Sequence, residues 1–281
     1  MASNLLAAGF PLVVHSRSAG PVDELVAAGA ERAASPAEVA GRVDVVVTML
    51  PDTPDVELVL LGDGGIAQGS RPGSLVIDMS TIDPIATRRF AETLAEQDVE
   101  LLDAPVSGGD IGARDGTLSI MVGGPAEGFE RALPLFQVMG KNIVHVGGSG
   151  AGQVAKMCNQ LVVAGTLEMV SEAMVLAAKA GVDPARVRES LLGGFAGSKI
   201  LEVHGQRMLD RNYVPGFRAE LMAKDARIVV AAAGELGVPV PAFEVVRSQL
   251  ERLVKDRGGE VDYSALVTIR EDDAGVEVMG P

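Results

Sequence analysis

Short apolar runs alternate with segments of helical periodicity along the first half of the chain. The apolar runs lie at residues 11–15, 43–49, 74–79, 99–102, 119–122 and 143–146. Helix-period segments lie between them at residues 22–28, 54–61, 84–97 and 126–138. Strands that are joined through helices require right-handed crossovers. The pattern therefore predicts an α/β domain of the Rossmann-like, doubly wound kind, with a mostly parallel sheet and helices on both faces.

The pattern changes after the glycine-rich residues 147–150. Residues 151–180 form one long helical stretch, and helical segments follow at residues 184–192, 198–208, 217–236 and 242–255. We therefore expect two domains, an α/β domain over residues 1–147 and an all-α domain over residues 148–281. The acidic residues from Arg270 onward lack apolar periodicity and are expected to form a frayed tail.

Composition narrows the possible partners. The 281 residues are 47% hydrophobic and carry a formal net charge of −14. This charge argues against a nucleic acid or an anionic membrane surface as partner, so a small anionic ligand would have to be captured locally. The single Cys158 fits a reducing compartment, and we expect a cytoplasmic protein. We expect neither a leader peptide nor a membrane span.

The loop at residues 103–109, Asp-Ala-Pro-Val-Ser-Gly-Gly, follows an apolar run that ends at Leu102. Pro105 stiffens the exit from the strand, while Gly108 and Gly109 leave consecutive N–H groups free to face a ligand such as a carboxylate. A tight turn needed only to reverse the chain would show the same residues.

Lys156 lies in the first turns of the long helical stretch, with Asn159 and Gln160 three and four positions later on the same face. A positioned ammonium can stabilise and protonate a developing alkoxide. An ordinary solvated lysine is the alternative. Because the three histidines and Cys158 have no metal-ligand spacing, we expect no metal site.

Four segments resemble the β-hydroxyacid dehydrogenase family, which includes 3-hydroxyisobutyrate dehydrogenases and tartronate semialdehyde reductases. They are residues 1–9, residues 103–109, residues 150–156 (Gly-Ala-Gly-Gln-Val-Ala-Lys) and the pair Lys224-Asp225. They occur in the family's order, and the resemblance covers nearly the whole chain. It implies an enzyme that transfers a hydride between NAD(P) and a small anionic aldehyde or hydroxy acid.

The resemblance also implies roles for single residues. Lys156 corresponds to the family's catalytic lysine, and the substrate is expected to contact Ser107, Gly108 and Gly109. Many relatives carry Asn at the fourth position after this lysine, where this chain has Gln160. Asn159 and Gln160 are therefore both substrate-binding candidates, with Asn159 preferred.

Cofactor contacts are expected at the carboxyl edge of the sheet. Leu50 and Pro51 follow one apolar run, and Thr81 follows another. Arg17 lies between two serines after the first run, where an arginine suits a 2′-phosphate and an acid would bind the ribose hydroxyl. This favours NADP, with NAD as the alternative. By resemblance, Lys224 approaches the cofactor.

The beginning of the chain departs from the family. Residues 1–9 already read as a helix that ends at Gly9. In a dinucleotide-binding unit a strand and a glycine-rich turn precede this helix, so we expect roughly 10–15 residues to be missing. We expect the missing strand to be central, between the strands near Pro11 and near Ser74, and Met1 to be an internal methionine of a longer protein.

Residues 193–208 most resemble tartronate semialdehyde reductases, which reduce 2-hydroxy-3-oxopropionate to glycerate. A 3-hydroxyisobutyrate dehydrogenase is the alternative enzyme, and a non-catalytic binding or assembly module is the alternative outside enzymology. Apolar residues surround much of the helix over residues 154–178, so we expect a homodimer or homotetramer.

Overall fold

The computed structural model describes residues 1–280. The chain divides into two compact units, Met1–Lys156 and Met157–Pro281, with the division inside one long helix, α9 (Ala151–Lys179). The domain boundary expected after residue 147 lies a few residues before this division and stays a prediction. Pro281, the last residue of the expected second domain, lies outside the described residues.

The first unit is a Rossmann-like domain in which helices alternate with strands. Its helices are α1 (Ala2–Ala7), α2 (Ala19–Ala27), α3 (Pro36–Arg42), α4 (Thr53–Leu61), α5 (Ile66–Gly69), α6 (Pro84–Ala95), α7 (Gly109–Asp115) and α8 (Ala126–Met139). Its strands are β1 (Val13–Val14), β2 (Glu31–Arg32), β3 (Val45–Thr48), β4 (Leu75–Asp78), β5 (Glu100–Asp103), β6 (Val106–Ser107), β7 (Leu118–Gly123) and β8 (Gly140–Gly147).

The main sheet is mixed but mostly parallel, as expected, and only the antiparallel pairings of β7 depart from that expectation. Its order is β3-β4-β5-β7-β6, and β8 pairs with β7. The pairs β3–β4, β4–β5 and β7–β8 are parallel, whereas β5–β7 and β6–β7 are antiparallel. Only residues 108–117, which include the seven-residue α7, separate β6 from β7. This connection is too short for a parallel crossover, so the chain returns antiparallel.

The strands β1 and β2 pair only with each other in a separate two-stranded parallel sheet. The strand near Ser74, β4, has β3 on one side and β5 on the other. The expectation that a missing strand would neighbour β4 is therefore wrong, because that strand has no open edge. The strand at the end of the main sheet is β3. Within residues 1–280, no strand precedes α1.

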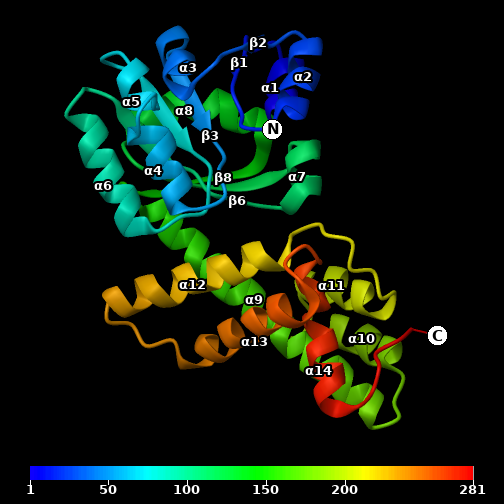
Figure 1. Cartoon of the computed structure of the whole chain (residues 1–281). Coiled ribbons are helices and arrows are strands. Elements are labelled where there is room, and N and C mark those ends of the chain that lie inside the picture. The colour runs from blue at the N-terminus through cyan, green and yellow to red at the C-terminus, as the bar shows by residue number, and fades with distance from the viewer. Residues whose placement is uncertain (281) are drawn as a thin grey trace. The chain divides into compact units, whose positions relative to one another are not determined.

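Helices cover both faces of the main sheet (Figure 1). On one face, Val76 of β4 packs in a core with side chains of α3, α4, α5 and α6, including the fully buried Phe90. On the other face, Leu75 and Ile77 pack with side chains of α1 and α8, including Phe136. All four residues of β4 are buried, as expected of a strand covered on both faces.

The second unit is helical. After α9 it contains α10 (Pro184–Leu192), α11 (Lys199–Leu209), α12 (Ala219–Glu235), α13 (Pro241–Arg257), the 3₁₀ turn η1 (Tyr263–Ala265) and α14 (Leu266–Ala274). Helices α12 and α13 pack side by side (Figure 1). By length and composition alone α9 could cross a membrane, but 44% of its apolar window is buried, and core helices of water-soluble proteins meet the same criterion.

The C-terminal segment is anchored, which corrects the expected frayed tail. Residues 266–274 form α14, and Val278 is fully buried. The backbone N–H of Val278 donates to Glu271 Oε1 at 2.6 Å, and Arg211 donates to the Val278 carbonyl at 3.2 Å. Arg211 also binds both oxygens of Glu271. Acidic residues near this end are thus bound by arginine rather than left in solvent.

Candidate active site

The start of α9 lies against the carboxyl ends of two strands of the first unit. Asp103, the last residue of β5, accepts hydrogen bonds from the backbone N–H groups of Gly150 and Gln153, each at 2.8 Å. Burial, with a smaller contribution from the Asp78 carboxylate, raises the pKa of Asp103 to about 6, although the two N–H donors act in the opposite direction. The first turn of α9 is therefore bound by a carboxylate that is almost completely withdrawn from solvent.

Gln153 links the same turn to the segment after β4. Its side-chain oxygen accepts from the N–H of Ile82 at 3.1 Å, and its amide nitrogen donates to the carbonyl of Ser80 at 2.8 Å. Ser80 in turn donates to Asp78 and accepts from the N–H of Leu50. The first turn of α9, the end of β5 and the segments after β3 and β4 are thus joined by one buried network.

Two glycines allow this close approach. A Cβ added at Gly152 would lie 2.4 Å from the carbonyl oxygen of Met121 and 2.6 Å from that of Asp103. A Cβ added at Gly123 would lie 2.6 Å from the N atom of Gly152. The glycines around Gln153 are therefore required by the packing of helix on strand.

Lys156 follows Gln153 by three residues, and both side chains are buried, with Lys156 only 6% exposed. Burial sets it apart from an ordinary surface lysine, which keeps its ammonium in water. The structure therefore gives Lys156 the enclosed position that a proton donor to substrate would need.

The loop after β5 is open to solvent where the sequence places substrate contacts. Ser107 ends β6 opposite Ser119 of β7, and it is partly exposed. Gly108 and Gly109 are exposed and adopt φ angles of +136° and +62°. Because such angles strongly favour glycine, the turn itself accounts for both glycines, and carboxylate binding by this loop stays a prediction.

The two amides after Lys156 differ in their partners. Gln160 is buried, and its amide nitrogen donates to Asp225 Oδ2 at 2.6 Å. Asn159 Oδ1 is buried, and among residues 1–280 it has no hydrogen-bond partner. Because a buried acceptor without a partner costs free energy, Asn159 is the better candidate to bind a substrate hydroxyl.

Lys224 lies in α12 and is buried beside Asp225, with its Nζ 3.0 Å from Asp225 Oδ1. Gln160 binds the other oxygen of the same carboxylate. Asp225 therefore holds Lys224 on one side and the α9 amide on the other. The sequence pattern singled out the pair Lys224-Asp225 but not the contact with Gln160.

Residues proposed for the cofactor lie at the carboxyl ends of β3 and β4. Leu50 and Thr81 are partly exposed there and Pro51 is exposed. Ends of parallel strands with accessible backbone fit a dinucleotide, since such ligands bind at this edge of an α/β sheet. Among residues 1–280, no glycine-rich turn joins a strand to α1. The described residues therefore fit the part of the cofactor site at the ends of β3 and β4, but not the part that holds the pyrophosphate.

Arg17 lies just before α2, and its side chain is 77% exposed. Its guanidinium is 3.3 Å from Asp55 Oδ1 of α4. An exposed ion pair of this kind contributes little to stability, so Asp55 does not prevent Arg17 from binding a phosphate.

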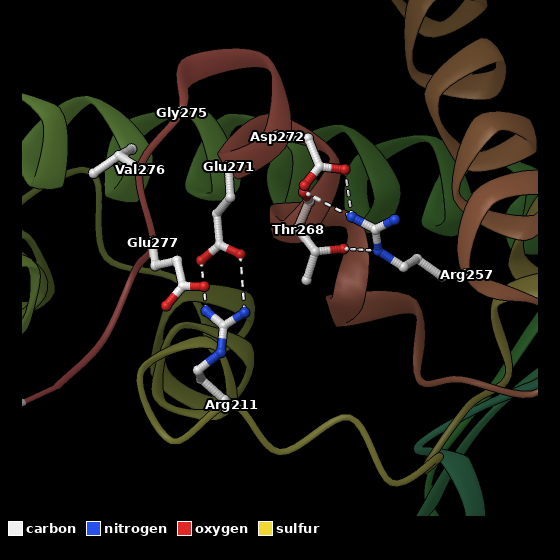
Figure 2. A pocket seen from close by; sticks show the side chains of 8 residues that line it. All are labelled: Arg211, Arg257, Thr268, Glu271, Asp272, Gly275, Val276 and Glu277. Carbon is white, nitrogen blue, oxygen red and sulfur yellow. Dashed lines mark hydrogen bonds and ion pairs between the residues drawn. The ribbon is translucent and has the colours of Figure 1, made fainter.

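A cavity of about 580 Å³ lies elsewhere, in the second unit (Figure 2). Its charged lining residues are largely paired with each other, Arg211 with Glu271 and Arg257 with Asp272. Residues predicted for the catalytic, substrate or cofactor site do not line it. This cavity therefore belongs to the anchoring of the C-terminal segment.

Sequence reasoning did not identify the roles of Asp103 and Gln153. Both lie within motifs that it singled out, but their contacts join residues 47 to 73 positions apart. The sequence did contain one signal, the Gly-Ala-Gly-Gln segment before Lys156. A helix that begins after a glycine has no side chain of its own to cap it, so another part of the chain must supply the acceptor.

Comparison with known proteins covers both units. The NAD binding domain of 6-phosphogluconate dehydrogenase matches residues 1–147, and the NAD-binding domain of NADP-dependent 3-hydroxyisobutyrate dehydrogenase matches residues 150–269. The 2-hydroxy-3-oxopropionate reductase of Escherichia coli is 47% identical over 96% of this chain and 92% of its own length. A 3-hydroxyisobutyrate dehydrogenase of Pseudomonas aeruginosa is 40% identical over 88% of this chain and 86% of its own.

The fold has close relatives among solved structures. A 3-hydroxyisobutyrate dehydrogenase of Mycobacterium tuberculosis, with L-serine, superposes with a TM-score of 0.87 at 30% identity over 96% of this chain and 94% of its own. The two matching family models and the Rossmann-like domain thus define an NAD(P)-dependent dehydrogenase. The chain belongs to the β-hydroxyacid dehydrogenase family, whose members are enzymes.

Proposed function

We propose that the chain reduces tartronate semialdehyde (2-hydroxy-3-oxopropionate) to glycerate with NAD(P)H. The observation that carries this proposal is the 47% identity to a 2-hydroxy-3-oxopropionate reductase over 96% of the chain. The orphaned acceptor Asn159 Oδ1 supports it, because the 2-hydroxyl of this substrate can donate to a buried oxygen.

The proposed reaction assigns a role to each candidate residue. NAD(P)H, when bound, would supply the hydride for the aldehyde carbon and would itself be oxidised to NAD(P)⁺. Lys156 donates a proton from its ammonium to the carbonyl oxygen, which completes the product alcohol and leaves the lysine as a neutral amine. Ser107, Gly108 and Gly109 bind the substrate carboxylate, while Asn159 accepts from its hydroxyl. Lys224, held by Asp225, approaches the cofactor.

The decisive experiment compares two aldehyde acids side by side, each with NADPH and with NADH. We expect kcat/KM for tartronate semialdehyde to exceed that for methylmalonate semialdehyde, which has a methyl group in place of the hydroxyl. In Asn159→Leu the preference should shrink or reverse. If the parent chain prefers methylmalonate semialdehyde, it is a 3-hydroxyisobutyrate dehydrogenase, the activity of another relative.

Substitution of Ser107 tests the carboxylate loop. Ser107→Ala should raise KM for the aldehyde acid severalfold and leave KM for the cofactor nearly unchanged, because the hydroxyl is proposed to bind substrate alone. Steady-state kinetics with one substrate varied at a time measure both constants. A larger change in the cofactor's KM would assign this loop to the cofactor.

Cofactor choice depends on Arg17 in our proposal, with NADP preferred. Arg17→Asp should weaken the binding of NADPH by about tenfold or more and the binding of NADH much less, because the new carboxylate repels a 2′-phosphate. Asp55→Asn, which only removes the ion-pair partner of Arg17, is the matched control and should keep NADPH binding. Equal loss of both cofactors in Arg17→Asp would make Arg17 structural.

We also propose a homodimer or homotetramer. Val162, Met169 and Leu176 of α9 are spaced seven residues apart, and they are 63%, 56% and 71% exposed. Such a stripe on one helix face suits burial against another copy. Light scattering at micromolar concentration should give at least twice the 29.0 kDa chain mass, and Met169→Glu should lower it. A monomeric parent would contradict the proposal.

The surroundings of the enzyme are part of the same proposal. A net charge of −14 favours a small, locally captured anionic substrate over nucleic acid or a membrane surface. The single, exposed Cys158 suits the reducing cytoplasm.

A further inference from the structure

The first turn of α9 receives its N-terminal cap from a distant strand. Gly150, the residue before the helix, has no side chain, so it cannot itself satisfy the free N–H groups of the first turn. Asp103 of β5 supplies both acceptors instead. Its Oδ1 accepts from Gly150 N–H and its Oδ2 from Gln153 N–H, both at 2.8 Å. Each carboxylate oxygen is thus committed to a different amide.

The side chain of Gln153 adds a second connection. It bonds to the Ser80 carbonyl and the Ile82 N–H, just beyond β4. The first turn of α9 is therefore fixed to the ends of two neighbouring parallel strands, in which Asp78 and Asp103 stand opposite each other. Because Gln153 and Lys156 are three residues apart, the contacts that fix Gln153 also fix the helix face that carries Lys156.

The geometry points to Asp103 as a positioning residue for Lys156, which sets the place and orientation of the lysine by binding the first turn of its helix. Gln153 assists through its two side-chain bonds. The inference rests on the proposed function, in which Lys156 is the proton donor. It does not require Asp103 to touch substrate or cofactor.

The charged Asp103 carboxylate disfavours folding at neutral pH. A role in positioning Lys156 can therefore be measured separately from a contribution to stability. Burial, with the facing Asp78, raises the pKa of Asp103 to about 6, above its usual 3.8. A carboxyl group with a raised folded-state pKa favours folding most at low pH, and that contribution is lost as pH rises through about 6. Arg88, whose side chain lies against Ser149 and Gly150, is a nearby cation that does not reverse this. At pH 7.5 a neutral residue at position 103 would avoid the cost.

Asp103→Asn tests the inference because asparagine has the same shape but only one acceptor oxygen. One of the two helix amides then faces an NH₂ group and loses its bond. Asp183→Asn is the matched control, since the exposed Asp183 caps α10 through a single bond to Ala185 N–H that asparagine can replace. Three quantities are measured for each variant at pH 7.5, namely amide exchange at Gly150 and Gln153, the urea midpoint, and kcat with KM.

We expect Asp103→Asn to speed exchange at one or both amides by at least tenfold and to lower kcat by about tenfold or more, with KM changed less. Its urea midpoint should change little, because relief from burying a charge offsets the cost of the lost hydrogen bond. Gln153→Met, which removes only the side-chain bonds, should lower kcat by a smaller factor. Asp183→Asn should leave kcat and both amides unchanged.

Unchanged exchange at both amides, or unchanged kcat in Asp103→Asn, would overturn the inference. A steep fall of the urea midpoint or failure to fold would make Asp103 a structural residue and would overturn it as well. The amide exchange needs no substrate. If the parent chain turned over neither aldehyde acid, the proposed function would fail while the exchange data still decided whether Asp103 fixes the helix.

Discussion

Replacing Lys156 by alanine should lower kcat by about 10²–10⁴, the usual contribution of a positioned proton donor. The side chain is buried, so water would not readily replace the lost ammonium. KM for NAD(P)H should change little, because the lysine is proposed to act on the substrate oxygen. Single-turnover oxidation of NAD(P)H measures the chemical step directly.

Lys141→Ala is the control for this variant, since Lys141 is an exposed lysine of the same unit. It should keep the parent's kcat. Circular dichroism and the urea midpoint establish that Lys156→Ala is folded. More than half of the parent's activity in a folded Lys156→Ala would remove Lys156 from the reaction.

Apolar runs in the sequence predicted the strands of the main sheet well where a strand is buried on both faces, because such a strand is apolar throughout. The run at residues 74–79 contains β4, which is buried throughout. The same reasoning missed β2 and β6, which have two residues each and no apolar pattern of their own. The antiparallel pairing of β7 with β5 and β6 was also missed, because strand direction depends on the length of the connection through α7 and not on the composition of the strands.

The candidate site could be predicted one residue at a time but not as an arrangement. Lys156 and its two amide neighbours share one helix, so their spacing in sequence shows that they lie close together. The amide of Gln160, however, binds Asp225, which lies 65 residues later in the chain. No local pattern contains that contact, and only the fold separates the engaged Gln160 from Asn159 with its unpartnered oxygen.

Gly152→Ala should destabilise the first unit by about 1–3 kcal/mol and lower kcat as well, because there is no room for a methyl group at the start of α9. The added Cβ would lie 2.4 Å and 2.6 Å from two backbone oxygens and 2.9 Å from Asp103 Oδ2. Backbone atoms of β5 and β7 cannot turn aside as a flexible side chain would. The helix start must therefore move away from the sheet, and Lys156 moves with it.

Gly165→Ala in the same helix is the matched control, since a Cβ there meets no atom within 4 Å. With no overlap, alanine should stabilise the helix by roughly 0.5–1 kcal/mol relative to glycine. Gly152→Ala would gain the same propensity, so its net loss measures the steric overlap against the strands. Urea unfolding of both variants, together with kcat, gives the comparison. If Gly152→Ala were as stable and as active as Gly165→Ala, α9 would not be held tightly against β5 and β7, and the packing that positions Lys156 would be wrong.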